Sequence, residues 1–171
     1  MLHHPLQQLP EPTFFRILRW SRGCFWVVLA LLTLVRLVSL PLQKLSPQLI
    51  LTLIPEYAGA IGFWAGFDYL FMTAYTCFFM VCSVWAAGRY RIGSFGYNAG
   101  IALAWLSLLQ LFLDMSENCC MWLLIIDKGG KAMEQWLGFF SFAKVPIFAA
   151  TVFYVLITSM LVWFKVLDRQ A

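Results

Sequence analysis

Four long apolar runs constrain this chain more than any other feature. They cover residues 23–41, 61–87, 97–126 and 134–165. A helix needs about 20 mainly apolar residues to cross the hydrocarbon core of a bilayer. The composition agrees, with 62% hydrophobic and 12% charged residues. The sequence therefore predicts an all-α, polytopic membrane protein, in which residues 1–171 form a single bundle of four transmembrane helices.

The chain around the first run predicts an uncleaved span. The run has the character of a signal-peptide core, but no small-residue cleavage site follows it. Instead Arg36 continues the helix, and Pro41 is expected to end it. Residues 42–60 carry a short apolar stretch, Leu49–Ile54, between two prolines. Because that stretch is too short to cross a bilayer, we expect the segment to lie at the interface or to dip partly inward.

Lysine and arginine residues outside the spans predict the orientation. The side with both termini and the loop between the second and third spans carries seven of them: Arg16, Arg19, Arg22, Arg89, Arg91, Lys165 and Arg169. The other side carries three: Lys44, Lys128 and Lys131. Because cytoplasmic loops are enriched in such residues, both termini are predicted to be cytoplasmic. The membrane itself is expected to be a bacterial inner membrane. Tryptophans are expected as anchors at the interfaces: Trp20, Trp85 and Trp163 inside, Trp64, Trp122 and Trp136 outside.

Several functional classes are disfavoured by composition. The five cysteines form no C-x-x-C pair, and we expect them to behave as small apolar residues, with adjacent Cys119 and Cys120 the only thiols worth testing. His3 and His4 precede the first span, which excludes haem ligation by membrane histidines. No metal site and no cofactor is predicted. The net charge of +4 is explained by residues flanking the spans, so no nucleic-acid partner is expected.

The third run contains an unusual polar face. Ser107, Gln110, Asp114, Glu117 and Asn118 follow the three-and-four spacing of one side of a helix. A charged side chain near the bilayer centre costs about 2.5–3.5 kcal/mol on insertion scales. Two carboxylates on one span therefore need basic partners, protons or water. Since Asp114 and Glu117 lie one turn apart, an acid/base pair is also geometrically feasible.

The other spans carry charged residues at matching depths. Arg36, Asp68 and Lys144 are all predicted to fall in the outer half of the bundle, within a turn or two of the carboxylates on the third span. We therefore expect one polar cluster of two bases and three acids. The candidate ligand-binding residues are Arg36, Asp68, Tyr75, Gln110, Asp114, Glu117, Asn118 and Lys144. Aromatic residues are expected to line the site: Phe63, Trp64, Phe67, Tyr69, Phe71, Tyr75, Phe139, Phe140 and Phe142.

A short motif adds a resemblance to a group of proteins. Phe67-Asp68 with Tyr75, followed by Asp114-x-x-Glu117-Asn118, resembles a pattern in small, uncharacterised four-helix bacterial membrane proteins. The resemblance covers mainly the second and third spans. It implies no activity.

Three functional readings follow from these residues. The first is a membrane protein with an intramembrane carboxylate-containing site, which binds a proton or a lipid-like or cationic small molecule. The second is a non-catalytic accessory or assembly subunit whose buried charges pair with a partner membrane protein. The third is an enzyme that acts on lipids. Purely structural pairing of the charges, which fixes the register of the bundle, is the alternative to all three. Membrane lipids are partners in every case.

Overall fold

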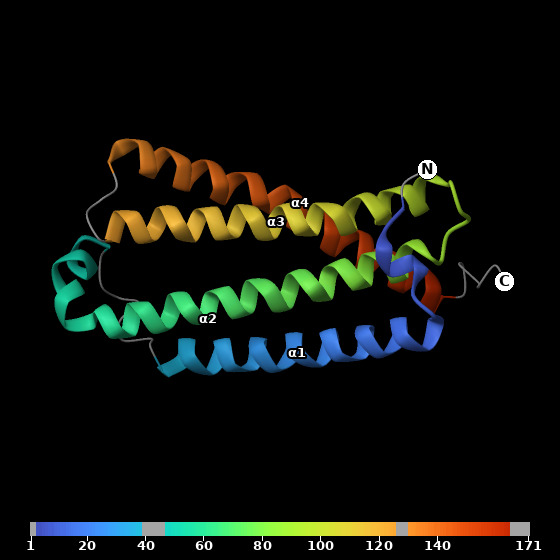
Figure 1. Cartoon of the computed structure of the whole chain (residues 1–171), viewed down its shortest axis with the longest axis horizontal. Helices are drawn as coiled ribbons and strands as arrows, with labels where there is room; N and C mark the ends of the chain where they lie inside the picture. Colours follow the sequence, from blue (N-terminus) through green and yellow to red (C-terminus); the bar gives the residue numbers. More distant parts are fainter. Residues whose placement is uncertain (1–2, 39–46, 126–129, 165–171) are drawn as a thin grey trace.

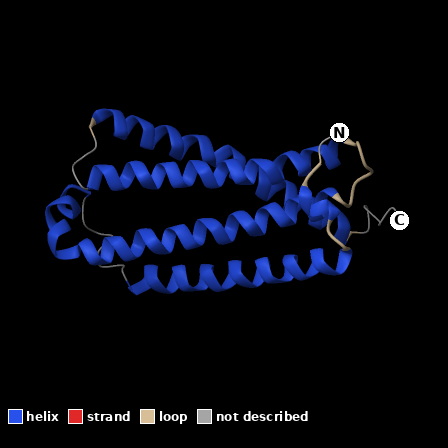
Figure 2. Cartoon of the chain, viewed as in Figure 1, coloured by secondary structure: helices blue, strands red, loops and turns tan. Residues whose placement is uncertain are grey.

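The computed structural model describes residues 3–38, 47–125 and 130–164. A short 3-10 helix, η1 (Pro5–Gln8), precedes four long helices: α1 (Glu11–Val38), α2 (Pro47–Ala87), α3 (Phe95–Ile125) and α4 (Lys131–Trp163). Within the described ranges the chain contains no strand (Figure 2). The predicted all-α bundle of four helices is confirmed.

The four helices lie lengthwise beside one another (Figure 1). The helix η1, the start of α1 and the end of α4 lie at one end of the bundle, together with the turn between α2 and α3. We call this the termini end, and the opposite end the far end. Helix α3 packs against both α2 and α4, whereas α1 packs mainly against α2. The bundle is thus a tight group of three helices with α1 on the outer side of α2.

Two helices extend well beyond the predicted spans. Helix α1 begins at Glu11 rather than near residue 23. Helix α2 has 41 residues, about 60 Å at 1.5 Å per residue, which is twice the hydrocarbon thickness of a bilayer. Its first turns, drawn in teal in Figure 1, bend away from the rest of the helix. Pro55 lies in this stretch, and a proline inside a helix removes a backbone hydrogen bond and favours a bend.

The distribution of side chains is that of a membrane protein. Large apolar residues such as Phe112, Phe142, Phe153 and Leu156 are exposed on the outside of the bundle. Polar residues lie inside it: Thr76, Ser83, Ser107, Gln110, Asp114, Asn118, Thr151 and Thr158 are all buried. Each of the four helices is long and apolar enough to cross a membrane. The chain is a multi-pass integral membrane protein.

Close glycine contacts join α2, α3 and α4 at the termini end. A Cβ at Gly100 would lie only 2.8 Å from the Cβ of Ala87 and would also collide with the Tyr154 hydroxyl, while one at Gly96 would enter the ring of Tyr90. The Tyr154 hydroxyl donates a hydrogen bond of 2.9 Å to the Gly96 carbonyl. Small residues that allow helices to approach closely are the usual means of packing in membranes. The helices are therefore closely packed at this end.

The residues before α1 pack against the bundle, although the sequence indicates only a polar lead-in. Gln7 Nε2 donates to the Tyr97 hydroxyl at 2.9 Å, and Trp105 Nε1 donates to the His3 carbonyl at 3.1 Å. The buried His4 ring lies 4.8 Å from the Trp105 ring. Burial lowers the pKa of His4 below its ordinary value. These contacts hold residues 3–8 along the side of α3.

Candidate functional site

Three charged residues lie at one level of the bundle because of where their helices begin and end. Counted from the helix end nearest the termini, each lies 19 positions along its helix: Asp68 from Ala87, Asp114 from Phe95 and Lys144 from Trp163. At 1.5 Å per residue this places all three about 28 Å from the termini end. Three spans thus contribute a charged residue to the same layer of the bundle.

Lys144 of α4 forms the centre of the cluster. Its Nζ donates to Asp114 Oδ1 at 2.7 Å and also contacts the Glu117 carboxylate. The other Glu117 oxygen accepts a hydrogen bond of 2.6 Å from the Ser141 hydroxyl. The side chain of Lys144 is 29% exposed, and those of Asp114 and Glu117 are 3% and 19% exposed. One ammonium group therefore compensates two carboxylates and links α3 to α4.

A second group of contacts links α2 to α3. Asn118 Nδ2 donates to Asp68 Oδ2 at 2.6 Å, and Gln110 Nε2 donates to the Tyr75 hydroxyl at 3.4 Å. The amide groups of α3 thus hold the polar side chains of α2 in place. Ser107, on the same face, is buried and donates back to the Leu103 carbonyl at 2.9 Å.

One oxygen of Asp114 has no hydrogen-bond partner. While Oδ1 accepts from Lys144, Oδ2 is buried and unpaired among the described residues. A buried carboxylate oxygen without a donor is costly in a protein interior. The described part of the cluster also holds three carboxylates, those of Asp68, Asp114 and Glu117, against one ammonium group. Asp114 therefore carries unused capacity to bind a cation or a hydrogen-bond donor.

The polar layer opens into a cavity of about 420 Å³. Its polar wall is made by Asp68, Tyr75, Gln110, Asp114 and Lys144, and its apolar wall by Phe25, Leu29, Phe71, Met72, Phe79, Val145 and Phe148. The aromatic side chains contact one another edge to face, with ring centroids 5.9 Å apart for Tyr75 and Phe148 and 5.5 Å for Phe79 and Phe148. The cavity combines one polar side with aromatic and aliphatic walls.

The position of α1 explains why the cavity exists. Phe25 and Leu29 of α1 form one wall, and Val145 and Phe148 of α4 form another. Since α1 packs mainly against α2, the cavity lies where α1 and α4 do not close on each other. Val145 and Phe148 are themselves exposed on the outside of the bundle. The cavity is therefore bordered by exposed apolar residues.

Seven of the eight residues selected from the sequence come together. Asp68, Tyr75, Gln110, Asp114 and Lys144 line the cavity, while Glu117 and Asn118 contact Lys144 and Asp68. Arg36 belongs to α1, but its side chain lies outside the described residues.

The expected aromatic lining is corrected in part. Phe71 and Tyr75 line the cavity, and the side chains of Phe63 and Trp64 lie outside the described residues. The other five expected aromatics are not part of its lining: Phe67, Tyr69, Phe139, Phe140 and Phe142. Sequence reasoning missed Phe25, Phe79 and Phe148. The four-residue spacing of Phe71, Tyr75 and Phe79 placed Phe79 on the same helical face and was the available signal.

The chemistry open to this site is binding and proton exchange. No three His, Cys, Asp or Glu side chains of the described residues gather closely enough to hold a metal ion. The two thiols singled out from the sequence differ in position, since Cys119 is exposed and Cys120 is buried. The carboxylates, the amide and the phenol can accept or donate hydrogen bonds to a guest in the cavity.

Comparison of the chain with protein-family models, with curated proteins and with solved structures finds no match.

Proposed function

We propose that this protein binds an amphipathic small molecule with a cationic or hydrogen-bond-donating head in the cavity beside Asp114. The unpaired, buried Oδ2 of Asp114 carries the proposal. A hydroxyl group placed there donates a hydrogen bond to that oxygen. An ammonium group does the same and also adds positive charge to a layer with more carboxylates than ammonium groups among its described residues. Asp68 lies in the same wall and supplies a second carboxylate.

The apolar part of the guest lies against the aromatic wall. A volume of about 420 Å³ falls within the range of pockets that hold small molecules. Phe25, Phe79 and Phe148 offer π-faces and edges to a chain or to a cationic head. The exposed positions of Val145 and Phe148 favour entry from the lipid rather than from water. A lipid-like amine fits both walls.

Binding of a long-chain amine tests this function. The purified protein in mild detergent is titrated with dodecylamine and with neutral dodecanol, and binding is followed by calorimetry. Loss of a hydrogen bond to a charged group costs about 1.5–3 kcal/mol. We therefore expect Asp114→Asn to weaken dodecylamine binding roughly 10- to 150-fold, and to change dodecanol binding much less.

Glu134→Gln is the matched control. Glu134 is an exposed carboxylate in the first turn of α4, outside the cavity, and the same isosteric change there should leave binding unaltered. Equal dodecylamine affinity for the parent, Asp114→Asn and Glu134→Gln proteins would rule out the proposed site.

A non-catalytic accessory subunit is the second candidate. It is favoured by the contacts of Lys144 with two carboxylates and of Asn118 with Asp68, which join three helices without a guest. In that case the cluster holds the bundle in shape for a partner membrane protein. Native mass spectrometry separates the two candidates: retention of a small amphipathic molecule supports the first, and a stoichiometric co-purifying protein with no small-molecule binding supports the second.

We infer that both termini face the cytoplasm of a bacterial inner membrane. The distribution of arginine residues supports the orientation, since Arg89 and Arg91 lie in the turn at the termini end. In a variant without native cysteines, a single cysteine is placed at Ser94 or at Lys131. A membrane-impermeant maleimide added to intact cells should label only position 131. Labelling of position 94 alone would show that the orientation is the opposite of the one inferred.

A further inference from the structure

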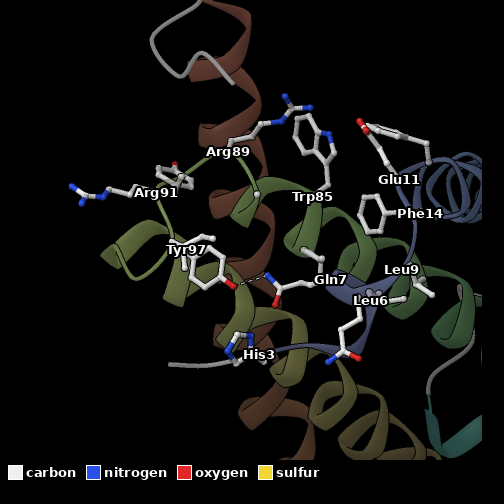
Figure 3. Close-up of a pocket in the computed structure, with 16 residues that line it drawn as sticks. His3, Leu6, Gln7, Leu9, Glu11, Phe14, Trp85, Arg89, Arg91 and Tyr97 are labelled. Atoms are coloured by element: carbon white, nitrogen blue, oxygen red, sulfur yellow. Dashed lines mark hydrogen bonds between the residues drawn. The ribbon is translucent and has the colours of Figure 1, made fainter. Parts of the chain in front are cut away.

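A second cavity, of about 780 Å³, lies at the termini end of the bundle. Figure 3 shows it between the first residues of the chain, the end of α2 and the start of α3. The carboxylates of the first cavity lie well away from it, because Asp68 and Asp114 are about 28 Å along their helices from this end. The two cavities have no lining residue in common.

The docked N-terminal residues form one wall of this cavity. His3, Leu6 and Gln7 all line it, and the hydrogen bond from Gln7 to the Tyr97 hydroxyl crosses its floor (Figure 3). Gln7 Oε1 also accepts from the His4 backbone N–H at 3.1 Å, so the amide is held from both sides. The wall is thus built by specific polar contacts that fix the segment against α3.

The charged groups around this cavity are mostly basic. The Arg89 guanidinium lies over the Trp85 ring, 4.8 Å from its centroid, and Arg91 is exposed in the following turn. Glu11 is the acidic lining residue. Three further arginines occupy the neighbouring half of α1: Arg16, Arg19 and Arg22. The positive field of this end favours an anion.

The remaining walls are apolar. Phe14 and Phe15 of α1 and Val84 of α2 line the cavity on the side of the transmembrane helices. Trp85 lies in its wall, and tryptophan is enriched where the hydrocarbon meets the headgroups. The ligand that fits has an anionic oxygen head beside the arginines and an apolar body beside the phenylalanines.

We propose that this cavity binds the phosphate headgroup of an anionic membrane phospholipid. The guanidinium group of an arginine is planar, and its N–H donors can bind two phosphate oxygens at once. Basic pockets between transmembrane helices at the membrane surface are suited to such headgroups. The acyl chains extend from the cavity along Phe14 and Phe15 into the bilayer. The proposal is independent of the guest beside Asp114.

The experiment uses delipidated full-length protein in mild detergent and native mass spectrometry. The protein is incubated with equal amounts of dioleoylphosphatidylglycerol and dioleoylphosphatidylcholine. We expect preferential retention of phosphatidylglycerol. Each arginine near a headgroup is worth roughly fivefold in affinity, so Arg89→Gln with Arg91→Gln should remove most of the preference.

Controls separate this cavity from general attraction to positive charge. Arg19→Gln with Arg22→Gln removes the same charge at the same end, outside the cavity lining, and should retain the preference. If the Arg89/Arg91 variant does not fold, the single Arg91→Gln variant should reduce the preference roughly fivefold. Equal retention of the two lipids by the parent protein, or equal losses in the two double variants, would overturn the proposal.

A competition experiment with inorganic phosphate distinguishes a lipid headgroup from free phosphate. Displacement of phosphatidylglycerol by millimolar phosphate would overturn the assignment to a lipid.

Discussion

Replacement of Lys144 by methionine removes the ammonium group at the centre of the carboxylate cluster. Methionine keeps a flexible side chain of similar length, so the change is mainly one of charge. Asp114 Oδ1 then loses its donor and joins Oδ2 as an unpaired buried atom. Glu117 keeps its hydrogen bond from Ser141 and is less damaged. We expect the variant to be clearly less stable than the parent.

Two reference values bound the expected loss in the free energy of unfolding. Removal of one partner from a fully buried ion pair costs about 3–5 kcal/mol in soluble proteins. A single interhelical polar contact in a membrane protein contributes about 0.6 kcal/mol, and at most about 1.7. Lys144 makes two such contacts, and its side chain is 29% exposed, which lowers the upper bound. We therefore expect a loss of about 2 kcal/mol, or a decrease in Tm of about 4–8 °C for a chain of this size.

Thermal unfolding in detergent measures the effect, with Lys131→Met as the control on the same helix. Lys131 is exposed at the first residue of α4 and should tolerate the change. Addition of Asp114→Asn and Glu117→Gln to Lys144→Met should recover part of the stability, because the uncompensated charges disappear. A Lys144→Met protein that melts with the parent would refute the claim that this ion pair supports the bundle.

Three further predictions concern other parts of the chain. Gly100→Ala should lower Tm by several degrees, because its Cβ collides with Ala87 and Tyr154, whereas Gly138→Ala, which meets open space, should not. Burial lowers the pKa of His4 in the folded chain, so the docking of residues 3–8 is fully stable above the ordinary value of 6.5 and weakens as the pH falls below it. The protection of this segment against hydrogen exchange, corrected for the pH dependence of the intrinsic exchange rate, should decrease between pH 7.5 and 5, and His3→Gln should not alter that decrease. Arg36→Leu should lower Tm if Arg36 pairs with a carboxylate in the bundle, and an unchanged Tm would place its guanidinium at the membrane interface.

The position of the charged residues along the bundle axis could be predicted from the sequence. Asp68, Asp114 and Lys144 have positions that follow from residue counts and a fixed rise per residue, and the structure brings these three into one layer. Contacts between Asp114 and Lys144 follow from their opposite charges in an apolar medium.

The direction in which each helix faces could not be predicted with the same success. Large apolar residues cover most of helix α4, so hydropathy alone does not separate Phe148, which lines the cavity, from Phe142, which does not. The four-residue spacing of Lys144 and Phe148 was the available signal. The docking of residues 3–8 depends on contacts about 100 positions away, such as that of Trp105 with the His3 carbonyl. Local sequence patterns do not contain such long-range contacts.

The glycine contacts at the termini end affect how far the carboxylate cavity can open. Helices that pack as closely as α2, α3 and α4 do around Gly100 have little freedom to slide there, so relative motion becomes a tilt about that point. The layer of Asp114 is about 28 Å away, and over that lever a tilt of about 5° displaces a helix by about 2 Å. A small rotation at a rigid pivot is thus amplified into a change in the width of the cavity mouth. Substitutions at the pivot should alter the rate at which a guest enters and leaves without touching the guest.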